Sequence, residues 1–307
     1  MDMTLTTIIC VGQCKHMPVR DSGKSYNIVL MHKELTISFI GGGNMASALA
    51  AGLIGKRCAA HDVHVIDPDE ITLTRWSEQG VSVAAEPDAE LSSRRVWIFA
   101  VKPQVMKEVV LRCRPYLQSD TLVISIAAGI SSASIAKWLG SSDQPWTRLI
   151  RCMPNTPALI GAGVTGLMAL EGISQDDKMI AQQLMRTVGE MVWVNNDQQL
   201  DAVTALSGSG PAYVFLFIEA LIEGGKKLGL TDEQARTLAL ATLNGATQLA
   251  ALSPETPATL RDRVTSKGGT TAAALAVFQQ KDFASVVQQA MQAAYDRAAE
   301  LSIEFTK

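Results

Sequence analysis

Between residue 35 and about residue 194, short apolar runs rich in β-branched residues alternate with longer stretches of helical period. The short runs predict strands at residues 35–40, 63–66, 96–101, 121–126, 148–152, 164–169 and 191–194. Strands of this length and Val/Ile content, with helices between several of them, are typical of a mostly parallel sheet that is covered on both faces. Segment 34–195 is therefore predicted to be an α/β domain.

Past residue 196 the predicted strands end and helical signals dominate. Gly210-Pro211 puts a proline at the first position of a helix, where its missing N–H has no helical partner to lose. Thr231 and Gln234 form a capping box for the helix that follows. Segment 196–307 is therefore predicted to be an all-helical domain.

Residues 1–33 are polar and mixed, with no sustained period, and we expect them to be an N-terminal extension outside the fold. They lack the basic and then apolar segments of a secretory signal. No apolar run in the chain reaches the ~18 residues that a membrane span needs. The five cysteines form no C-x-x-C pair and the four histidines do not cluster with them, which predicts reduced thiols and no metal site. We therefore expect a cytoplasmic protein.

Composition narrows the classes of function. The apolar fraction of 47% excludes intrinsic disorder, and the aromatic fraction of 5% means that the core rests on aliphatic residues and alanine. A net charge of −3 argues against a nucleic-acid partner, because such proteins need a basic face to neutralise phosphates. Small anionic ligands stay open, since helix ends bind them without a basic protein.

A glycine-rich loop follows the first predicted strand. Gly41-Gly42-Gly43-Asn44-Met45-Ala46 has the form G-x-G-x-x-A and opens a helix. In a dinucleotide-binding Rossmann domain the first glycine allows the tight turn and the second lets the backbone approach the pyrophosphate. The free N–H groups of the helix N-terminus then bind the phosphates. Gly41, Gly43, Asn44 and Met45 are therefore predicted to bind a cofactor.

The carboxyl ends of the other strands supply further candidates, because ligands bind there in open α/β sheets. Asp67 ends the second strand, and an acidic residue at this place bonds a ribose 2′-OH and repels a 2′-phosphate, which favours NAD over NADP. The alternative is that Asp67 is only a turn residue before Pro68. The remaining predicted cofactor-binding residues are Ala100, Val101, Lys102, Pro103, Ala127 and Asn155. Lys102 either contacts the cofactor or lies solvated at the sheet edge.

Two loops in the helical segment are rich in glycine and hydroxyl groups. They lie at residues 207–210 and 266–271, each before a predicted helix. Backbone N–H groups and hydroxyls at the positive end of a helix suit a carboxylate, although either loop by itself also fits an ordinary helix cap. Together with a dinucleotide fold, the two loops favour a small anionic substrate.

The helical segment contains no histidine. Alcohol dehydrogenation usually depends on a base whose pKa lies near neutrality. A protonated imine accepts hydride readily and needs positioning more than strong acid catalysis. The sequence therefore favours reduction of C=N over C=O, although Lys102 or Lys267 can still serve as an acid.

Several motifs occur in the order in which one enzyme family carries them. They are Phe39-Ile40-Gly41-Gly42-Gly43-Asn44-Met45-Ala46, Ala100-Val101-Lys102-Pro103, Arg151-Cys152-Met153-Pro154-Asn155-Thr156-Pro157, Asp201-Ala202-Val203-Thr204, Ser207-Gly208-Ser209-Gly210-Pro211-Ala212-Tyr213 and Leu260-Arg261-Asp262 with Val264-Thr265-Ser266-Lys267-Gly268-Gly269-Thr270-Thr271. Over about residues 35–300 the chain thus resembles pyrroline-5-carboxylate reductase, the last enzyme of proline biosynthesis.

The resemblance implies an oxidoreductase that transfers a hydride from NADPH or NADH to L-1-pyrroline-5-carboxylate and gives L-proline. It implies that the substrate carboxylate is held by Ser266, Gly268, Gly269, Thr270 and Thr271. It also assigns Thr271 the catalytic role of bonding the ring nitrogen and assisting its protonation. Family members form homodimers through their C-terminal helices and often decamers, so that sites lie between subunits.

The chain departs from the family at two informative places. Many members have a proline where Lys267 stands, so the resemblance gives this lysine no role. Many members also have a serine, or an asparagine followed by an arginine, after the second strand, which suits NADP. Here Asp67-Pro68-Asp69 occurs instead, and Asp67 favours NADH where the family commonly uses NADPH.

Two other functions compete with this reading. A β-hydroxyacid dehydrogenase also joins a Rossmann domain to a helical domain and should carry a catalytic lysine on a helix, for which Lys226 and Lys227 are the candidates. A non-catalytic redox sensor would bind the nucleotide without turnover, but it leaves the two hydroxyl-rich loops without a purpose.

Overall fold

The computed structural model describes residues 19–21, 24–26 and 35–305 of the chain. The chain divides into two units, Met1–Glu34 and Leu35–Lys307. In the first unit, strands β1 (Val19–Asp21) and β2 (Lys24–Tyr26) pair antiparallel. The rest of the expected extension at residues 1–33 lies outside the described residues.

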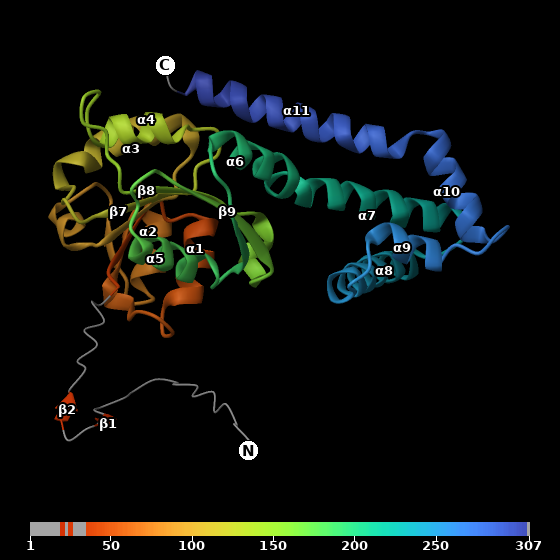
Figure 1. Ribbon diagram of the computed structural model, residues 1–307, viewed down its shortest axis with the longest axis horizontal. Helices are drawn as coiled ribbons and strands as arrows, with labels where there is room; N and C mark the ends of the chain where they lie inside the picture. The colour runs from red at the N-terminus through yellow and green to blue at the C-terminus, as the bar shows by residue number, and fades with distance from the viewer. Residues whose placement is uncertain (1–18, 22–23, 27–34, 306–307) are drawn as a thin grey trace. The chain divides into compact units, whose positions relative to one another are not determined.

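The second unit contains an eight-stranded sheet of order β10-β9-β8-β7-β6-β3-β4-β5 (Figure 1). Its strands are β3 (Ile37–Ile40), β4 (Val63–Ile66), β5 (Ser82–Ala84), β6 (Val96–Phe99), β7 (Leu122–Ser125), β8 (Leu149–Met153), β9 (Gly163–Ala169) and β10 (Gly189–Trp193). All neighbours pair parallel except β8 and β9. Strands β5-β4-β3-β6-β7-β8 have the Rossmann order, so the predicted fold class is confirmed.

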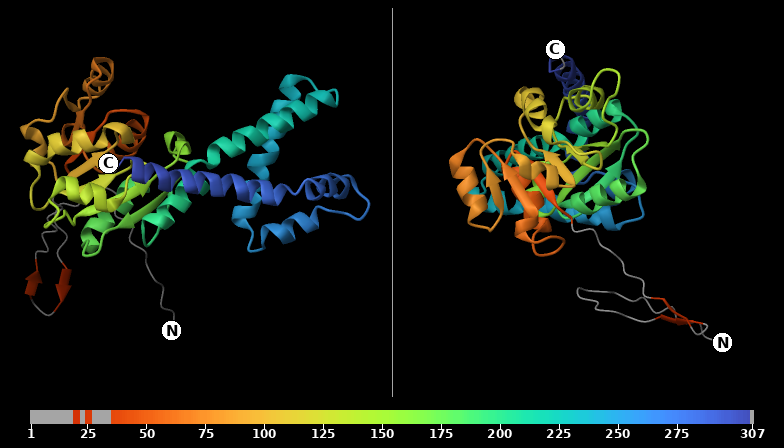
Figure 2. Two further views of the ribbon diagram at one scale, coloured as in Figure 1. Left: turned by 90° about the horizontal axis from the view of Figure 1, so that it is seen from above. Right: turned by 90° about the vertical axis from the view of Figure 1, so that its left-hand side faces the viewer.

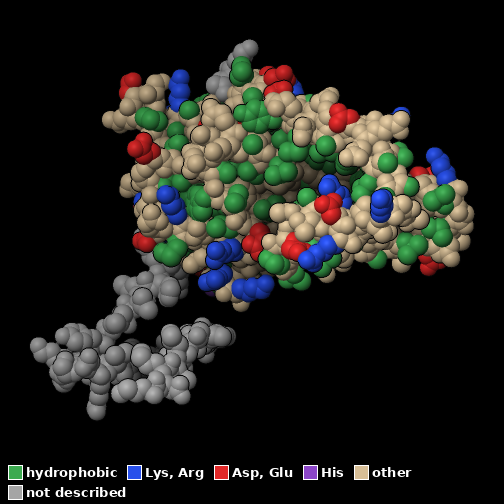
Figure 3. All heavy atoms as spheres, turned by 45° about the vertical axis from the view of Figure 1, so that its right-hand side comes forward, with side chains coloured by type: hydrophobic (Ala, Val, Ile, Leu, Met, Phe, Trp, Pro, Cys, Tyr) green, Lys and Arg blue, Asp and Glu red, His purple; other side chains and the backbone are tan. Residues whose placement is uncertain are grey.

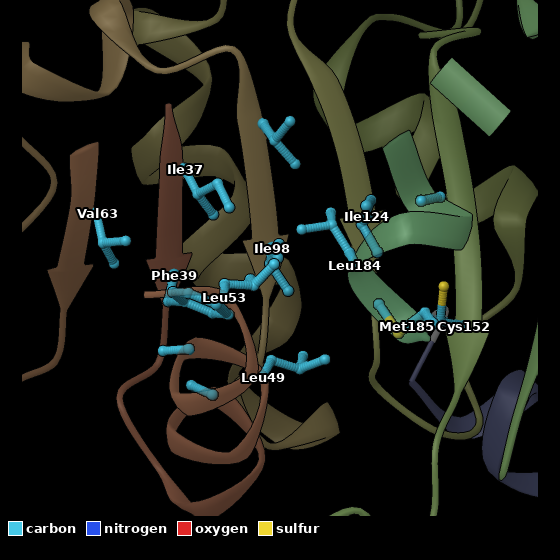
Figure 4. Close-up of a cluster of buried hydrophobic side chains, with 14 of the residues drawn as sticks. Ile37, Phe39, Leu49, Leu53, Val63, Ile98, Ile124, Cys152, Leu184 and Met185 are labelled. Atoms are coloured by element: carbon cyan, nitrogen blue, oxygen red, sulfur yellow. The ribbon is translucent and has the colours of Figure 1, made fainter. Parts of the chain in front are cut away.

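Alternate residues of the strands feed two hydrophobic cores, one on each face of the sheet. On one face Ile37, Phe39 and Ile98 pack with residues of α1 (Asn44–Leu53), α2 (Glu70–Ser77) and α5 (Gln175–Met185), part of which Figure 4 shows. On the other face Ile40 and Phe99 pack with α3 (Pro103–Cys113) and α4 (Ser132–Leu139). The sheet is thus covered on both faces, as its apolar strands predict.

The strand order reverses between β3 and β6. From β3 the chain continues to β4 on one side of this point, and from β6 it continues to β7 on the other side. The loops after these two strands therefore diverge at the carboxyl edge of the sheet. This divergence leaves a crevice in which α/β proteins bind their ligands. The glycine-rich loop after β3 and the segment from Ala100 to Pro103 after β6 flank this place.

The chain after the sheet is helical. Its elements are α6 (Asp197–Val203), a π-helical turn η5 (Thr204–Gly208), α7 (Gly210–Lys227), α8 (Asp232–Leu252), α9 (Pro257–Arg263), α10 (Thr270–Gln280) and α11 (Phe283–Glu304). Pro211 stands in the first turn of α7, and Thr231 and Gln234 form the predicted capping box of α8. Figure 2 shows α11 running back toward the sheet, where Leu301 approaches Gly129.

The helical domain leaves much apolar surface exposed within one chain. The exposed large side chains of α7 alone are Val214, Phe215, Leu216 and Leu221. Hydrophobic side chains occur over much of the face in Figure 3. Among the described residues one helical stretch, Asp197–Lys227, is long and apolar enough to cross a membrane, although a π-turn interrupts it.

Candidate active site

The glycine-rich loop is held tightly on both sides. Gly41 has a φ of +101°, and a Cβ at this position would lie 2.7 Å from the carbonyl oxygen of Ala100. The N–H of Gly41 donates to Ile66 of β4 at 2.8 Å, and the N–H of Ala100 donates to Ile40 of β3 at 2.7 Å. A glycine is therefore required here by the close approach of β6 and by the positive φ.

Gly43 lies where the same loop opens outward. It is the N-cap residue of α1, and its cap makes no side-chain hydrogen bond. A Cβ built on Gly43 would meet nothing within 4 Å. Asn44 is exposed and Met45 is half-buried. The α1 N-terminus thus offers uncapped backbone N–H groups beside an open space, which fits the pyrophosphate of a dinucleotide.

Asp67 is bonded to the loop as well as to its own turn. One carboxylate oxygen accepts from the N–H of Gly42 at 2.8 Å, and the other accepts from the N–H of Asp69 at 2.9 Å. The structure thus shows Asp67 as a turn residue whose carboxylate also lies next to the glycine-rich loop, and its cofactor-binding role stays a prediction. A carboxylate at this place bonds ribose hydroxyls and repels a phosphate.

Trp76 is a neighbour of the loop that the sequence patterns did not reveal. Its indole Nε1–H donates to the carbonyl oxygen of Gly42 at 2.9 Å, and a Cβ on Gly42 would lie 2.8 Å from that nitrogen. Trp76 is buried, and its ring stacks with the ring of Phe39 in β3. The middle glycine of the motif therefore makes room for an indole of α2.

The segment after β6 lies beside Gly41, as expected for cofactor-binding residues. Ala100 and Val101 are half-buried, whereas Lys102 is exposed at the N-cap of α3 and makes no side-chain cap bond. Pro103 occupies the first turn of α3. Ala127 after β7 is 5% exposed and packs into the core on the α3 and α4 face.

The side-chain amide of Asn155 forms hydrogen bonds with two other parts of the chain. Its Nδ2 donates to the carbonyl oxygen of Ser207 at 3.1 Å, and its Oδ1 accepts from the N–H of Val164 at 2.9 Å. It therefore ties the end of β8 to the start of β9 and to the π-turn η5. Sequence position alone suggested a ligand for this amide, but its hydrogen bonds in this structure go to the protein.

An ion pair that sequence reasoning missed joins the sheet to the helical domain. Arg151 in the middle of β8 is 4% exposed and pairs with Asp197, the first residue of α6. Asp197 also accepts from the N–H and the hydroxyl of Ser132 at 3.0 and 2.8 Å. Burial raises the pKa of the neighbouring Asp201, and the Arg151 guanidinium opposes this shift. Residues 46 apart in the chain give no local signal of such a pair.

The second predicted loop opens helix α10. Gly268 has a φ of +75°, and Gly269 is the N-cap residue and makes no side-chain cap bond. Ser266, Lys267 and Thr270 are exposed, while Thr271 is half-buried. The loop thus presents backbone N–H groups and hydroxyls at an uncapped helix N-terminus, which is suited to a carboxylate.

One chain does not bring the two loops together. Figure 1 shows α10 at the end of the helical domain that is remote from the sheet. Among the described hydrogen bonds and ion pairs, none joins the segment 266–271 to the segment 41–45. The site residues Ser266 to Thr271 therefore need a second copy of the chain if they are to face a cofactor on α1.

Lys226 is one of the two candidate lysines for a β-hydroxyacid dehydrogenase, and it pairs with two carboxylates. The Nζ of Lys226 lies 2.9 Å from Glu223 and 3.2 Å from Asp232. These carboxylates raise the pKa of Lys226, the hydrogen bond to Glu223 most strongly. A solvent-exposed, doubly paired ammonium is poorly placed to give up a proton near neutral pH.

Two family models match the chain. The model of pyrroline-5-carboxylate reductase dimerisation matches residues 197–301, and the model of coenzyme F420-dependent NADP oxidoreductase matches residues 36–129. The first covers the helices with exposed apolar faces, and the second covers the glycine-rich loop and Asp67.

Curated relatives and solved structures agree with these matches. Pyrroline-5-carboxylate reductase of Pseudomonas aeruginosa is 44% identical over 87% of this chain and 96% of its own length, and that of Haemophilus influenzae is 41% identical over 90% and 100%. The structure of the enzyme from Coxiella burnetii has a TM-score of 0.81 at 38% identity, covering 88% of this chain and 99% of that one. The Plasmodium falciparum structure with NADP bound has a TM-score of 0.77 at 28% identity, covering 88% and 99%. The chain therefore belongs to the pyrroline-5-carboxylate reductase family.

Proposed function

We propose that this chain reduces L-1-pyrroline-5-carboxylate to L-proline with a reduced nicotinamide dinucleotide as hydride donor. The observation that carries this proposal is the pair of uncapped helix N-termini, α1 behind Gly43 and α10 behind Gly269, in a chain of this family. One suits the pyrophosphate of the cofactor and the other suits the carboxylate of the imino acid.

The reaction adds one hydride to the C=N carbon and one proton to the ring nitrogen. When bound, the reduced nicotinamide supplies the hydride. The chain's own part is to hold the dinucleotide with Gly41, Gly43, Asn44 and Met45, and to orient the substrate. The residues after β6, together with Ala127 and Asn155, border the cofactor in this proposal.

The α10 loop holds the substrate in this proposal. The backbone N–H groups at the start of α10, behind Gly269, and the hydroxyls of Ser266 and Thr270 bind the carboxylate, with Gly268 allowing the turn. The hydroxyl of Thr271 bonds the ring nitrogen and assists its protonation. A protonated imine is already electrophilic, so the loop contributes mainly position and a fixed positive potential.

We further propose that the enzyme is a homodimer in which α10 of one copy faces α1 of the other. The exposed apolar side chains of α7 and the dimerisation match over residues 197–301 support this arrangement. Assembly of dimers into decamers and a cytoplasmic location remain predictions. The described cysteines are free thiols, and burial raises the pKa of Cys113 to about 12, so this thiol stays protonated and unreactive.

The function is tested by following NADH or NADPH absorbance with pyrroline-5-carboxylate, with a β-hydroxyacid panel in parallel. We expect nucleotide oxidation that depends on the imine and forms proline. Turnover of hydroxyacids without proline formation would favour the dehydrogenase alternative, and tight nucleotide binding without any turnover would favour a sensor.

Thr271→Ala should lower kcat by about 10²-fold or more, because positioned proton transfer contributes 10²- to 10⁴-fold in typical enzymes. The dissociation constant for the nucleotide, measured by fluorescence titration, should stay the same. Thr271→Ser should restore most of the rate, and Thr270→Ala should mainly raise KM for the imine. An unchanged kcat in Thr271→Ala would remove this hydroxyl from the chemistry.

Asp67→Ser should raise the ratio of kcat/KM for NADPH to that for NADH by about tenfold or more. Two unit charges about 5 Å apart at an effective dielectric of about 20 repel by about 3 kcal/mol, so removing the carboxylate relieves the 2′-phosphate. Glu70→Gln is the matched control, because it removes the same charge from the start of α2 without touching the loop. Equal ratios for Asp67→Ser and the control would show that Asp67 does not select the cofactor.

Mixed dimers test whether sites form between copies. Gly43→Asp puts a carboxylate where the pyrophosphate would lie, and Thr271→Ala disables the other half. Each variant should be nearly inactive by itself. Doubly tagged mixed dimers should recover about half of the wild-type rate if sites are shared, because one of the two sites is then native. Sites built within one chain would leave the mixed dimer as inactive as its parents.

A further inference from the structure

A row of polar side chains crosses the sheet away from the cofactor loop. Ser38 of β3, His64 of β4 and Ser82 of β5 are register partners, so their side chains lie next to one another on one face. Ser38 and His64 are both 0% exposed. A buried imidazole is costly unless its nitrogens have partners. Ser38 and His64 thus occupy buried positions in which apolar residues would pack into the core without this cost.

One nitrogen of His64 is satisfied and the other is not. Its Nδ1 lies 2.7 Å from the Ser38 hydroxyl. Its Nε2 is buried and makes no hydrogen bond in this structure. The nearest charged group to Nε2 is the carboxylate of Asp88 at 3.8 Å. An unpartnered, fully buried nitrogen is thus aimed at a carboxylate.

A short 3-10 helix, η2 (Ala89–Ser93), brings a second carboxylate to the same place. Asp88 caps η2 by accepting from the N–H of Glu90 at 2.9 Å. Glu90 accepts from the Ser82 hydroxyl at 2.6 Å and pairs with Arg94. The candidate ligand atoms of His64, Asp88 and Glu90 all lie within 4.8 Å of one another.

The charges of this cluster do not balance. Asp88 and Glu90 carry two negative charges, and Arg94 supplies one positive charge. One negative charge therefore remains beside a nitrogen that has no partner.

We propose that His64, Asp88 and Glu90 bind one divalent transition-metal ion of the Zn²⁺ class. Zn²⁺ takes imidazole nitrogen and carboxylate oxygen at about 2.0–2.2 Å, usually with four ligands. The side chains of Asp88 and Glu90 are 45% and 30% exposed, so they can close on the ion and leave the fourth position to water. In the metal-binding tautomer the His64 Nδ1–H donates to the Ser38 hydroxyl, which orients the imidazole and leaves Nε2 free to ligate the ion.

The ion would fasten η2, and with it the entry to β6, onto the sheet. The site stands apart from the proposed active site, because His64 lies toward the amino end of β4 while Asp67 follows its carboxyl end. Zinc binding here therefore does not depend on which reaction the enzyme catalyses. Mg²⁺ should not replace Zn²⁺, because it prefers oxygen ligands and strict octahedral geometry.

The test is Zn²⁺ binding to the full-length, EDTA-treated protein, measured by equilibrium dialysis with metal analysis. We expect the number of bound Zn²⁺ ions per chain to fall by one in His64→Gln. Asp88→Asn keeps an oxygen that caps η2 and should bind the ion at least about tenfold more weakly. The thermal midpoint of the wild type, but not of His64→Gln, should rise with Zn²⁺, because a ligand of the native state stabilises it.

The matched control is Cys58→Ser with His61→Gln, which removes two other candidate ligands near the same strand. His61 is 82% exposed and does not belong to the cluster. This variant should keep the stoichiometry of the wild type, and imine reduction should be unchanged in all variants. Equal Zn²⁺ stoichiometry in the wild type and His64→Gln would overturn the proposal, as would displacement of the ion by millimolar Mg²⁺.

Discussion

The buried ion pair between Arg151 and Asp197 holds the two domains of this enzyme together. Arg151 lies within the core strand β8 and Asp197 starts the first helix after the sheet, so their pairing fixes where the helical domain leaves the α/β domain. Ser132, the first residue of α4, donates its hydroxyl to the same Asp197 carboxylate and so connects α4 to this ion pair. A buried pair of this kind adds little net stability, but loss of one partner leaves a buried charge. Asn155 provides a second, neutral tie through Ser207, close to the π-turn. The direction of the long helices, and thus the reach of α10, follows from these contacts.

Much of the fold was readable from the sequence because its strands are short, apolar and separated by helical periods. All seven predicted strands occur, and their ends shift by at most two residues. β5 escaped prediction because Ser82, Val83 and Ala84 are too few and too mixed to show a pattern; pairing with β4 makes them a strand. The antiparallel pairing of β8 and β9 is also not encoded locally. It arises because a short connection joins the two strands, whereas a parallel pair needs a long crossover.

The candidate site was predictable in its backbone-driven parts and less so elsewhere. Gly41 and Asp67 could be predicted, because a positive φ requires a glycine and because a carboxylate at the end of a strand is visible in the sequence. The hydrogen bonds of the Asn155 amide with Ser207 and Val164 could not be predicted, because they depend on tertiary contacts. The same holds for Arg151, whose partner is distant in the chain. Both loops proposed to bind anions use helix N-termini, which explains how a chain with a net charge of −3 can take two anionic ligands.

The double use of Gly42 links cofactor choice to the integrity of the loop. Its N–H donates to Asp67 and its carbonyl oxygen accepts from Trp76, so the two peptide groups that flank the Gly42 Cα are both held by residues of the segment from β4 to α2. Exchanging Asp67 for a residue that welcomes a 2′-phosphate also removes one of these two hydrogen bonds. The carboxylate proposed to select the nucleotide thus also holds the glycine-rich loop, so a single substitution at Asp67 changes both properties at once.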